Sequence, residues 1–174
     1  MSVQTAVATP RPLPPEVPPQ LRVDSAYLHQ GILERARQQA TVQRLPYAGI
    51  VTPEEAWELT QAGQAVLVDV RTAEERRFVG QVPGSVHVPW ATGLNLQRNP
   101  KFVRELEGHV RRDDVVLLLC RSGARSAAAA QAATEARFHN VFSIADGFEG
   151  ELDARQQRGT RGGWRFLSLP WTQD

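Results

Sequence analysis

The stretch VVLLLCRSGARSAAAAQAA, residues 115–133, contains the features that decide the fold. Five apolar residues of strand length lead into Cys120, the only cysteine of the chain. A short loop of basic and small residues follows, and an alanine-rich segment of helical length begins near Ser126. Ligands of open α/β sheets bind beyond the carboxyl ends of the strands. We therefore expect Cys120 to lie at such a strand end.

Strands and helices alternate on both sides of this stretch. Further strands are predicted at GIV (49–51), AVLVDV (65–70), part of VPGSVHVPW (82–90) and VFSI (141–144), and helices at 53–61, from Thr72, 99–108, 126–138 and from Gly147 to about Gln157. Thr52 and Thr72 each precede a glutamate by three residues, which is the pattern of a helix capping box. The alternation predicts an α/β fold with a central, mostly parallel sheet and helices on both faces.

The two ends of the chain differ from this pattern. Residues 1–20 hold six of the twelve prolines, so we expect a disordered, extended tail that acts as a spacer in preference to a docking segment. Residues 21–46 are expected to form an N-terminal helix over 24–43, with Asp24 as its N-cap. Its buried face is predicted to comprise Tyr27, Leu28, Ile32, Leu33 and Ala36.

Residues 47–174 complete the predicted domain. After the last helix, an apolar C-terminal segment is expected to fold back onto the domain as a hydrophobic clasp. Its apolar residues are Trp164, Leu167, Leu169 and Trp171.

Composition excludes several functional classes. The chain of 174 residues has a net charge of +1, so no overall field draws it to nucleic acid or to an anionic membrane. We see no secretory signal and no apolar segment of membrane-spanning length, so a cytoplasmic protein is expected. One cysteine and four scattered histidines do not form a metal-binding pattern, and we expect neither a metal nor a cofactor.

The loop after Cys120 indicates a reactive thiol. It consists of Arg121, Ser122, Gly123, Ala124, Arg125 and Ser126. If the loop curls, its backbone N–H groups point inward. These groups would favour the thiolate, which is the nucleophilic form, as would the start of the next helix and the two guanidinium groups. The alternative is a small core cysteine at the end of an apolar strand, but basic and polar residues directly after the thiol are poor core material. The interpretation requires a sulfur that solvent reaches and amides that face it.

A family resemblance supports this interpretation. The chain resembles a single rhodanese-like domain over about residues 47–171, through VDVRTAEERRFVGQVPGSVHVPW (68–90), LLLCRSGARS (117–126) and VFSIADGFEG (141–150). The resemblance implies a sulfurtransferase in which Cys120 takes a sulfane sulfur from a donor such as thiosulfate, becomes a persulfide and passes the sulfur to a thiophilic acceptor. A small anionic donor is implied, and a protein acceptor is possible.

Three further residues are candidates for a supporting role. The resemblance implies that Asp69, Arg71 and Glu75 brace the active loop. The residues themselves favour a capping and ion-pair network with no chemical role, since Glu75 already caps at Thr72. The family often has histidine where this chain has Gln81, but this position is not the nucleophile. The family also often has an aromatic residue near Glu151, and its absence here affects packing at the rim of the site.

Two other functions remain open. A phosphatase or arsenate reductase of related fold also uses a thiolate, an amide nest and an arginine. Those enzymes place arginine after a cysteine and five intervening residues, whereas Arg125 follows Cys120 after four. The second alternative is a non-catalytic sulfur-carrier or protein-binding module, which would need the same thiolate.

Overall fold

The computed structural model describes residues 19–173, so the predicted tail at residues 1–20 lies almost entirely outside the described residues. Helix α1 spans Pro19–Gln43 and begins five residues before the predicted start. The prediction that Asp24 caps this helix was wrong, because Asp24 lies inside it. Proline suits the first turn of a helix, where its missing N–H has no intrahelical partner, and this permits the earlier start.

Five parallel strands form the central sheet. Their spatial order is β1-β7-β6-β2-β3, and every neighbouring pair is parallel. The strands are β1 (Gly49–Val51), β2 (Val66–Asp69), β3 (Val86–His87), β6 (Val116–Leu119) and β7 (Val141–Ile144). The predicted mostly parallel sheet is confirmed, and β6, which leads to Cys120, is its central strand.

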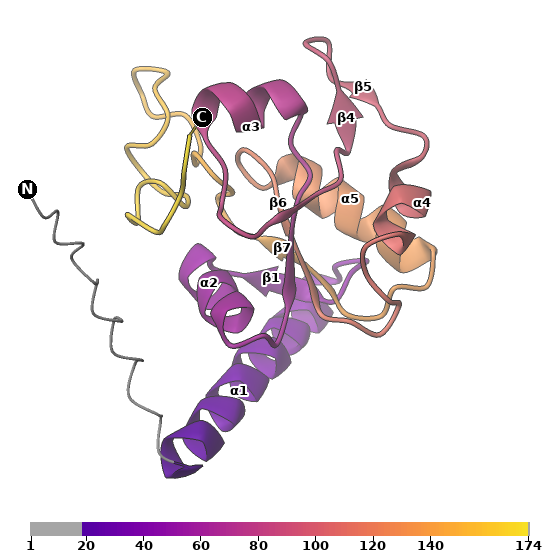
Figure 1. The fold of residues 1–174 in the computed structure, drawn as a ribbon, viewed down its shortest axis with the longest axis vertical. Coiled ribbons are helices and arrows are strands. Elements are labelled where there is room, and N and C mark those ends of the chain that lie inside the picture. Colours follow the sequence, from indigo (N-terminus) through magenta and orange to yellow (C-terminus); the bar gives the residue numbers. More distant parts are fainter. Residues whose placement is uncertain (1–18, 174) are drawn as a thin grey trace, which may run out of the picture.

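Helices cover both faces of the sheet, as predicted (Figure 1). They are α2 (Pro53–Gln61), α3 (Ala73–Val79), α4 (Phe102–Glu107) and α5 (Ala124–Glu135), besides α1. Both predicted capping boxes are present, at Thr52 with Glu55 and at Thr72 with Glu75. Helix α5 begins two residues before the predicted Ser126, since Gly123 takes a left-handed conformation (φ 97°) and turns the chain directly into the helix.

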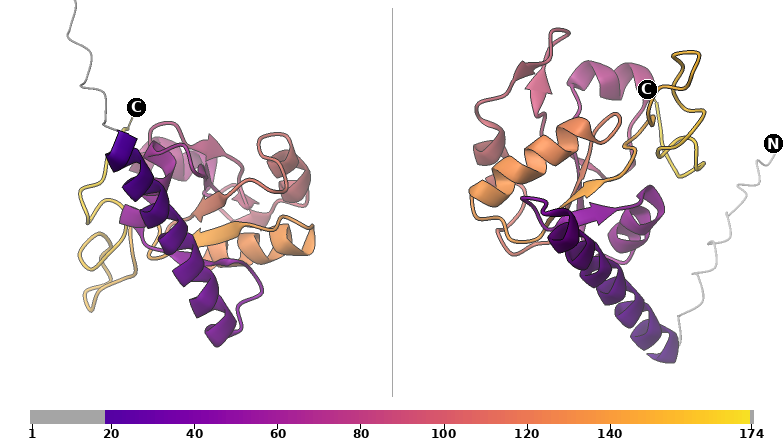
Figure 2. Two further views of the ribbon diagram at one scale, coloured as in Figure 1. Left: turned by 90° about the horizontal axis from the view of Figure 1, so that it is seen from below. Right: turned by 180° about the vertical axis from the view of Figure 1, so that it is seen from behind.

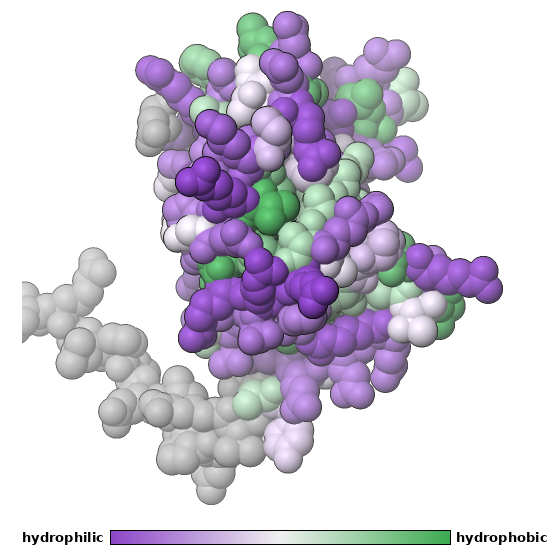
Figure 3. Space-filling view, turned by 90° about the vertical axis from the view of Figure 1, so that its right-hand side faces the viewer, coloured by the Kyte–Doolittle hydropathy of each residue, from purple (hydrophilic) through white to green (hydrophobic). Residues whose placement is uncertain are grey.

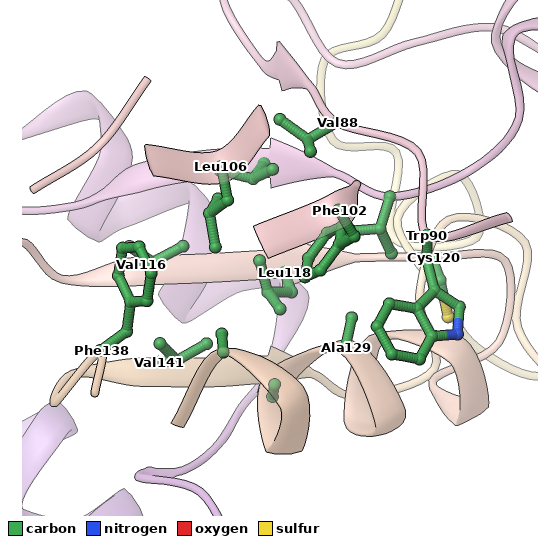
Figure 4. Packing of buried hydrophobic residues seen from close by; sticks show 14 of the residues in the cluster. Val88, Trp90, Phe102, Leu106, Val116, Leu118, Cys120, Ala129, Phe138 and Val141 are labelled. Carbon is green, nitrogen blue, oxygen red and sulfur yellow. The ribbon is translucent and has the colours of Figure 1, made fainter. Parts of the chain in front are cut away.

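Alternate residues of β6 serve two separate cores. Val116, Leu118 and Cys120 face the core under α4 and α5, whereas Leu117 and Leu119 face the core under α1 and α2. This alternation follows from the two-residue period of a strand whose faces are both covered. Figure 4 shows the first core, with Cys120 at the same end as Trp90.

Only part of the predicted apolar face of α1 is buried. Ile32 and Ala36 pack on the domain with exposures of 7% and 0%, whereas Tyr27 and Leu28 are 74% and 55% exposed. The N-terminal turns of the helix project beyond the sheet, so the apolar residues there have nothing among the described residues to pack against (Figures 1 and 2). His29 is buried instead and pairs with Glu58 at 3.3 Å.

A two-stranded hairpin between β3 and α4 was not predicted. It consists of β4 (Ala91–Thr92) and β5 (Gln97–Arg98), which pair antiparallel. Strands of two residues are too short to produce a periodic pattern. Gly93 and Leu96 turn the chain with positive φ angles of 67° and 50°, and Leu94 at the tip is 89% exposed.

The helix predicted from Gly147 to about Gln157 is absent from the structure, and that prediction was wrong. Asp146, Gly147 and Gly150 have φ angles of 58°, 60° and 77°, which a right-handed helix does not contain. The segment instead forms successive turns to the end of the described chain.

The C-terminal segment folds back onto the sheet, as predicted. Trp164 is completely buried, meets Trp57 edge-to-face and donates from Nε1 to the Pro170 carbonyl at 2.9 Å. Further on, Gln81 and Thr172 form a bridge beside the half-buried Trp171. Leu169 and Trp171 also pack against the core under α1 and α2, whereas Leu167 is 36% exposed, so three of the four predicted residues make the clasp.

In the view of Figure 3, hydrophobic groups adjoin one another near the middle of the face, and hydrophilic side chains surround them. Within residues 19–173, no helix combines the length and apolar character needed to cross a membrane.

Candidate active site

The candidate site lies at the carboxyl ends of two adjacent strands. Cys120 follows β6 directly, and Asp69 ends β2, which pairs with β6 in parallel register. Both residues are therefore at the same edge of the sheet, where ligands of open α/β folds bind. The structure brings the predicted nucleophile and the predicted supporting residues into one neighbourhood.

The sulfur of Cys120 has two polar neighbours. The Gly123 amide donates to Sγ over 3.1 Å, and the Ser126 hydroxyl lies 3.3 Å from Sγ. Ser126 in turn donates to the Gly123 carbonyl at 2.9 Å and lies 2.9 Å from the Ser143 hydroxyl. An amide that faces the sulfur was required by the sequence interpretation, and Gly123 provides one.

The exposure of the thiol differs from what the sequence interpretation required. Cys120 is only 1% exposed, and it also belongs to the core under α5. The loop closes over the sulfur because α5 starts early, at Ala124, and leaves only four residues, 120–123, between the end of β6 and the helix. The thiol is thus held by polar groups from the loop while solvent is excluded from it.

A second turn clips the cysteine loop from outside. The Phe148 amide donates to the Cys120 carbonyl at 2.8 Å, and the Glu149 amide donates to the Arg121 carbonyl at 2.9 Å. Gly147 makes this approach possible, since a Cβ atom there would lie 2.4 Å from the Cys120 carbonyl oxygen. The turn after β7 therefore fixes the backbone of the loop.

Both arginines of the loop are paired with carboxylates. Arg125 donates to the two Glu75 oxygens at 2.7 and 2.6 Å, and Arg121 donates from Nε to Glu149 at 2.9 Å. Hydrogen bonding to Glu75 raises the pKa of Arg125, and its proximity to Cys120 adds to the increase. The sequence placed two positive charges next to the thiol, and in the structure each has a carboxylate partner: Glu75 in α3 for Arg125 and Glu149 after β7 for Arg121.

Asp69 and Arg71 form a completely buried ion pair beneath the site. Arg71 donates to Asp69 from Nε at 3.0 Å and from Nη2 at 2.7 Å, and Nη2 also donates to the Gly80 carbonyl at 2.8 Å. The guanidinium lies 3.9 Å from the centre of the Phe148 ring. Among the described residues, the pair makes no hydrogen bond to the cysteine loop, so any bracing acts through Phe148.

Glu75 connects the loop to α3 and is the one supporting candidate that touches it. Burial raises the pKa of Glu75, but hydrogen bonds from Arg125 and from the Thr72 amide outweigh burial and lower the pKa overall. Its carboxylate therefore caps α3 and holds the first turn of α5 at the same time. The two roles weighed from the sequence, capping and bracing, coexist in one side chain.

A pH-dependent contribution to stability follows from this lowered pKa. A carboxylate with a lowered folded-state pKa stabilises the fold above its unfolded-state pKa, and the contribution is lost as the pH falls through the folded-state pKa. We expect Glu75→Gln to lower the free energy of unfolding by on the order of 1 kcal/mol at pH 7, with a shrinking difference below about pH 4. Urea unfolding of both proteins from pH 3 to 7 measures this, and a constant difference across the range would contradict it.

A cavity of about 350 Å³ lies against the loop. Its lining combines loop residues with residues from α3, the β4–β5 hairpin and the C-terminal segment: Thr72, Glu74, Glu75, Gly93, Leu94, Leu96, Arg121, Ser122, Ala124, Arg125 and Arg158. Residues 19–173 contain no group of three or more His, Cys, Asp or Glu side chains arranged to hold a metal.

Sequence reasoning missed the hairpin residues and Arg158 as parts of the site. Leu94 and Leu96 come from an element that was not predicted, and Arg158 lies just after the end of a predicted helix that the structure lacks. Exposed leucines on a short polar segment are the only local signal, and nothing in the sequence relates Arg158 to the loop. Their proximity arises from tertiary packing alone.

Comparison with known proteins agrees with the geometry. The Rhodanese-like domain model matches residues 52–153, more than half of the chain. A crystal structure of Rv0390 from M. tuberculosis superposes with a TM-score of 0.67 and 46% identity, over 74% of this chain and 99% of that one.

Two curated relatives show the same extent of similarity. The uncharacterized protein RP600 of Rickettsia prowazekii is 36% identical over 62% of this chain and 82% of its own length. The thiosulfate sulfurtransferase GlpE of Glaesserella parasuis is 36% identical over 58% of this chain and 82% of its own length. The family match, the sheet order and the cysteine loop at the end of the central strand lead to one assignment: the chain belongs to the family of rhodanese-like domains.

Proposed function

We propose that the protein is a sulfurtransferase that moves a sulfane sulfur from a small anionic donor such as thiosulfate to a thiophilic acceptor through a persulfide on Cys120. The observation that carries this proposal is the position of Sγ, which lies beyond the central strand and accepts a hydrogen bond from the Gly123 amide. The similarity to a thiosulfate sulfurtransferase supports the choice of donor.

The first half-reaction forms the persulfide. The Cys120 thiolate attacks the outer sulfur of thiosulfate, a new S–S bond forms, and the bond to the inner sulfur breaks as sulfite leaves with the electron pair. The attacking sulfur belongs to the residue four positions before the start of α5, where the positive end of the helix dipole favours negative charge. The outer sulfur of the persulfide carries the same charge, so the same surroundings favour it.

The second half-reaction returns the free thiolate. A thiolate acceptor attacks the outer sulfur of the persulfide, and the electron pair of the broken S–S bond returns to Cys120. Ser126 supports both states, since its hydroxyl lies 3.3 Å from Sγ and can donate there or to the Gly123 carbonyl. The acceptor is either a small thiol or a cysteine of a partner protein.

The buried position of the sulfur defines how a donor approaches it. Ser122 and Ala124 line the 350 Å³ cavity and belong to the loop that follows Cys120, whose side chain is only 1% exposed. The donor therefore enters through this cavity and reaches Sγ when the Ser122 side of the loop moves aside.

Mass spectrometry of the intact protein tests the proposal. Incubation with thiosulfate is expected to add the mass of one sulfur atom, which peptide mapping assigns to Cys120, and a thiol acceptor then removes it. No mass increase with thiosulfate or other sulfane donors would overturn the proposal. Cys120-dependent hydrolysis of an aryl phosphate would instead favour a phosphatase.

A further inference from the structure

Three arginines line the cavity beside the cysteine loop, and they differ in what they already bind. Arg121 and Arg125 are paired with Glu149 and Glu75. Arg158, by contrast, has no carboxylate within 4.0 Å among residues 19–173, although Glu149 lines a smaller cavity with it. Its positive charge is thus available to a ligand, which the charges of the loop arginines are not.

The hydrogen-bonding capacity of Arg158 is largely unused. Nη1 donates to the Gly150 carbonyl at 2.6 Å, whereas Nε is buried without a partner among the described residues. A guanidinium has five N–H donors in a planar arrangement that suits bidentate binding of an oxyanion. The group is therefore held through Nη1, whereas Nη2 donates to no group among the described residues.

The segment that carries Arg158 is braced on both sides. Asp153 accepts hydrogen bonds from the amides of Arg155 and Gln157 and from the Thr160 hydroxyl, at 2.8, 2.9 and 2.9 Å. The Gly159 amide donates to the Glu149 carbonyl at 2.8 Å, which joins the segment to the turn that clips the cysteine loop. The position of Arg158 is thus built into the fold, beyond residue 153 where the family match ends.

The lining of the cavity is also partly apolar. Leu94 and Leu96 from the β4–β5 hairpin line it with exposures of 89% and 50%. Glu74 lines the cavity near the start of α3 and repels anions from that side. An oxyanion in the cavity is therefore directed away from Glu74 and toward Arg158.

We propose that Arg158 binds the oxyanion group of the substrate that enters the Cys120 cavity, and so determines substrate specificity. The inference rests on the proposed sulfurtransferase function and adds a residue from the C-terminal segment to it. Two substrates offer this chemistry: the sulfonate end of thiosulfate as donor, and a carboxylate on an organic thiol as acceptor.

Stopped-flow and quench measurements with Arg158→Gln distinguish the two sources. If the donor is recognised, the thiosulfate concentration that half-saturates persulfide formation rises roughly 10-fold, as expected for loss of a charged hydrogen bond. If the acceptor is recognised, the same rise occurs for sulfur release to 3-mercaptopropionate, and release to the neutral 3-mercaptopropanol is unchanged. Arg155→Gln removes an exposed charge from the same segment and is expected to change neither.

Two results would overturn the inference. One is unchanged half-saturation for both thiosulfate and 3-mercaptopropionate, and the other is an equal change for 3-mercaptopropionate and 3-mercaptopropanol with none for thiosulfate.

A binding measurement separates this inference from the proposed chemistry. NMR titration of the Cys120→Ser protein with thiosulfate and with 3-mercaptopropionate, with and without Arg158→Gln, needs no turnover. Weaker binding of either anion by roughly 10-fold in the double variant supports recognition by Arg158 even if wild type forms no persulfide. Equal binding of both anions by the two proteins counts against it even if the persulfide forms.

Discussion

Replacing Cys120 with serine is expected to lower the rate of sulfur transfer from thiosulfate by more than about 1,000-fold. A serine hydroxyl is not ionised, and the other groups of the site cannot form the covalent sulfur intermediate in its place. The chain contains no second cysteine that could take over. The measurement is the initial rate of sulfite release with thiosulfate and a thiol acceptor, together with the mass of the protein before and after incubation.

The substitution is expected to leave the fold intact. The serine hydroxyl can accept the hydrogen bond that the Gly123 amide donates to the sulfur, and it also faces the Ser126 hydroxyl. We therefore expect the free energy of unfolding to change by no more than about 1 kcal/mol. Equal stability with lost activity then separates a chemical role of the thiol from a structural one. Sulfite release by the serine variant at the rate of wild type would remove Cys120 from the mechanism.

Much of the fold could be predicted because its elements carry local signals. The strand at Val116–Leu119 is continuously apolar, since both of its faces are covered, and Thr52 and Thr72 begin helices through hydrogen bonds that span only three residues. Both features arise from residues close together in the sequence, so the sequence itself shows them. The sheet follows from them because parallel strands need long crossover connections, which are usually helices.

The prediction failed where the conformation depends on left-handed residues or on tertiary support. The run from Asp146 to Gly150 has no helix because three of its residues take positive φ angles, one of them an aspartate that could also have begun a helix. The hairpin at residues 91–98 is too short to show a period. The first turns of α1 extend past the domain, so apolar spacing alone overestimated the buried face.

For the site, the sequence located Cys120 and its loop but not their electrostatic partners. Arg121 and Arg125 read as free charges until Glu149 and Glu75 are brought to them from positions 28 and 50 residues away. Arg158, the third arginine that lines the cavity, has no carboxylate partner among residues 19–173, and no motif marks it. The balance of charge around the sulfur is thus a property of the folded chain, and it makes the turn after β7 as important to the site as the loop itself.

Gly147→Ala is expected to destabilise the protein strongly, although Gly147 lies outside the cysteine loop. A Cβ atom at this position would lie 2.4 Å from the Cys120 carbonyl oxygen and 2.7 Å from both the Arg121 carbonyl carbon and the Ser122 amide nitrogen. These are backbone atoms that cannot rotate away, and the left-handed φ of 60° adds strain. We expect a loss of about 3 kcal/mol or more in the free energy of unfolding, measured with urea.

The activity of this variant shows whether the turn also positions the loop. Displacing the turn breaks the hydrogen bonds from the Phe148 and Glu149 amides to the loop carbonyls. The rate of persulfide formation is therefore expected to fall by more than the decrease in the fraction of folded protein explains. Gly63→Ala is the matched control, because Gly63 has a similar φ of 67° and its added Cβ would meet nothing within 4 Å. It is expected to lose only about 1 kcal/mol and to keep its activity. If both variants lose the same stability and both form the persulfide at the wild-type rate, then the contact at Gly147 does not hold the loop, and the rigidity assigned to the site must come from α5 alone.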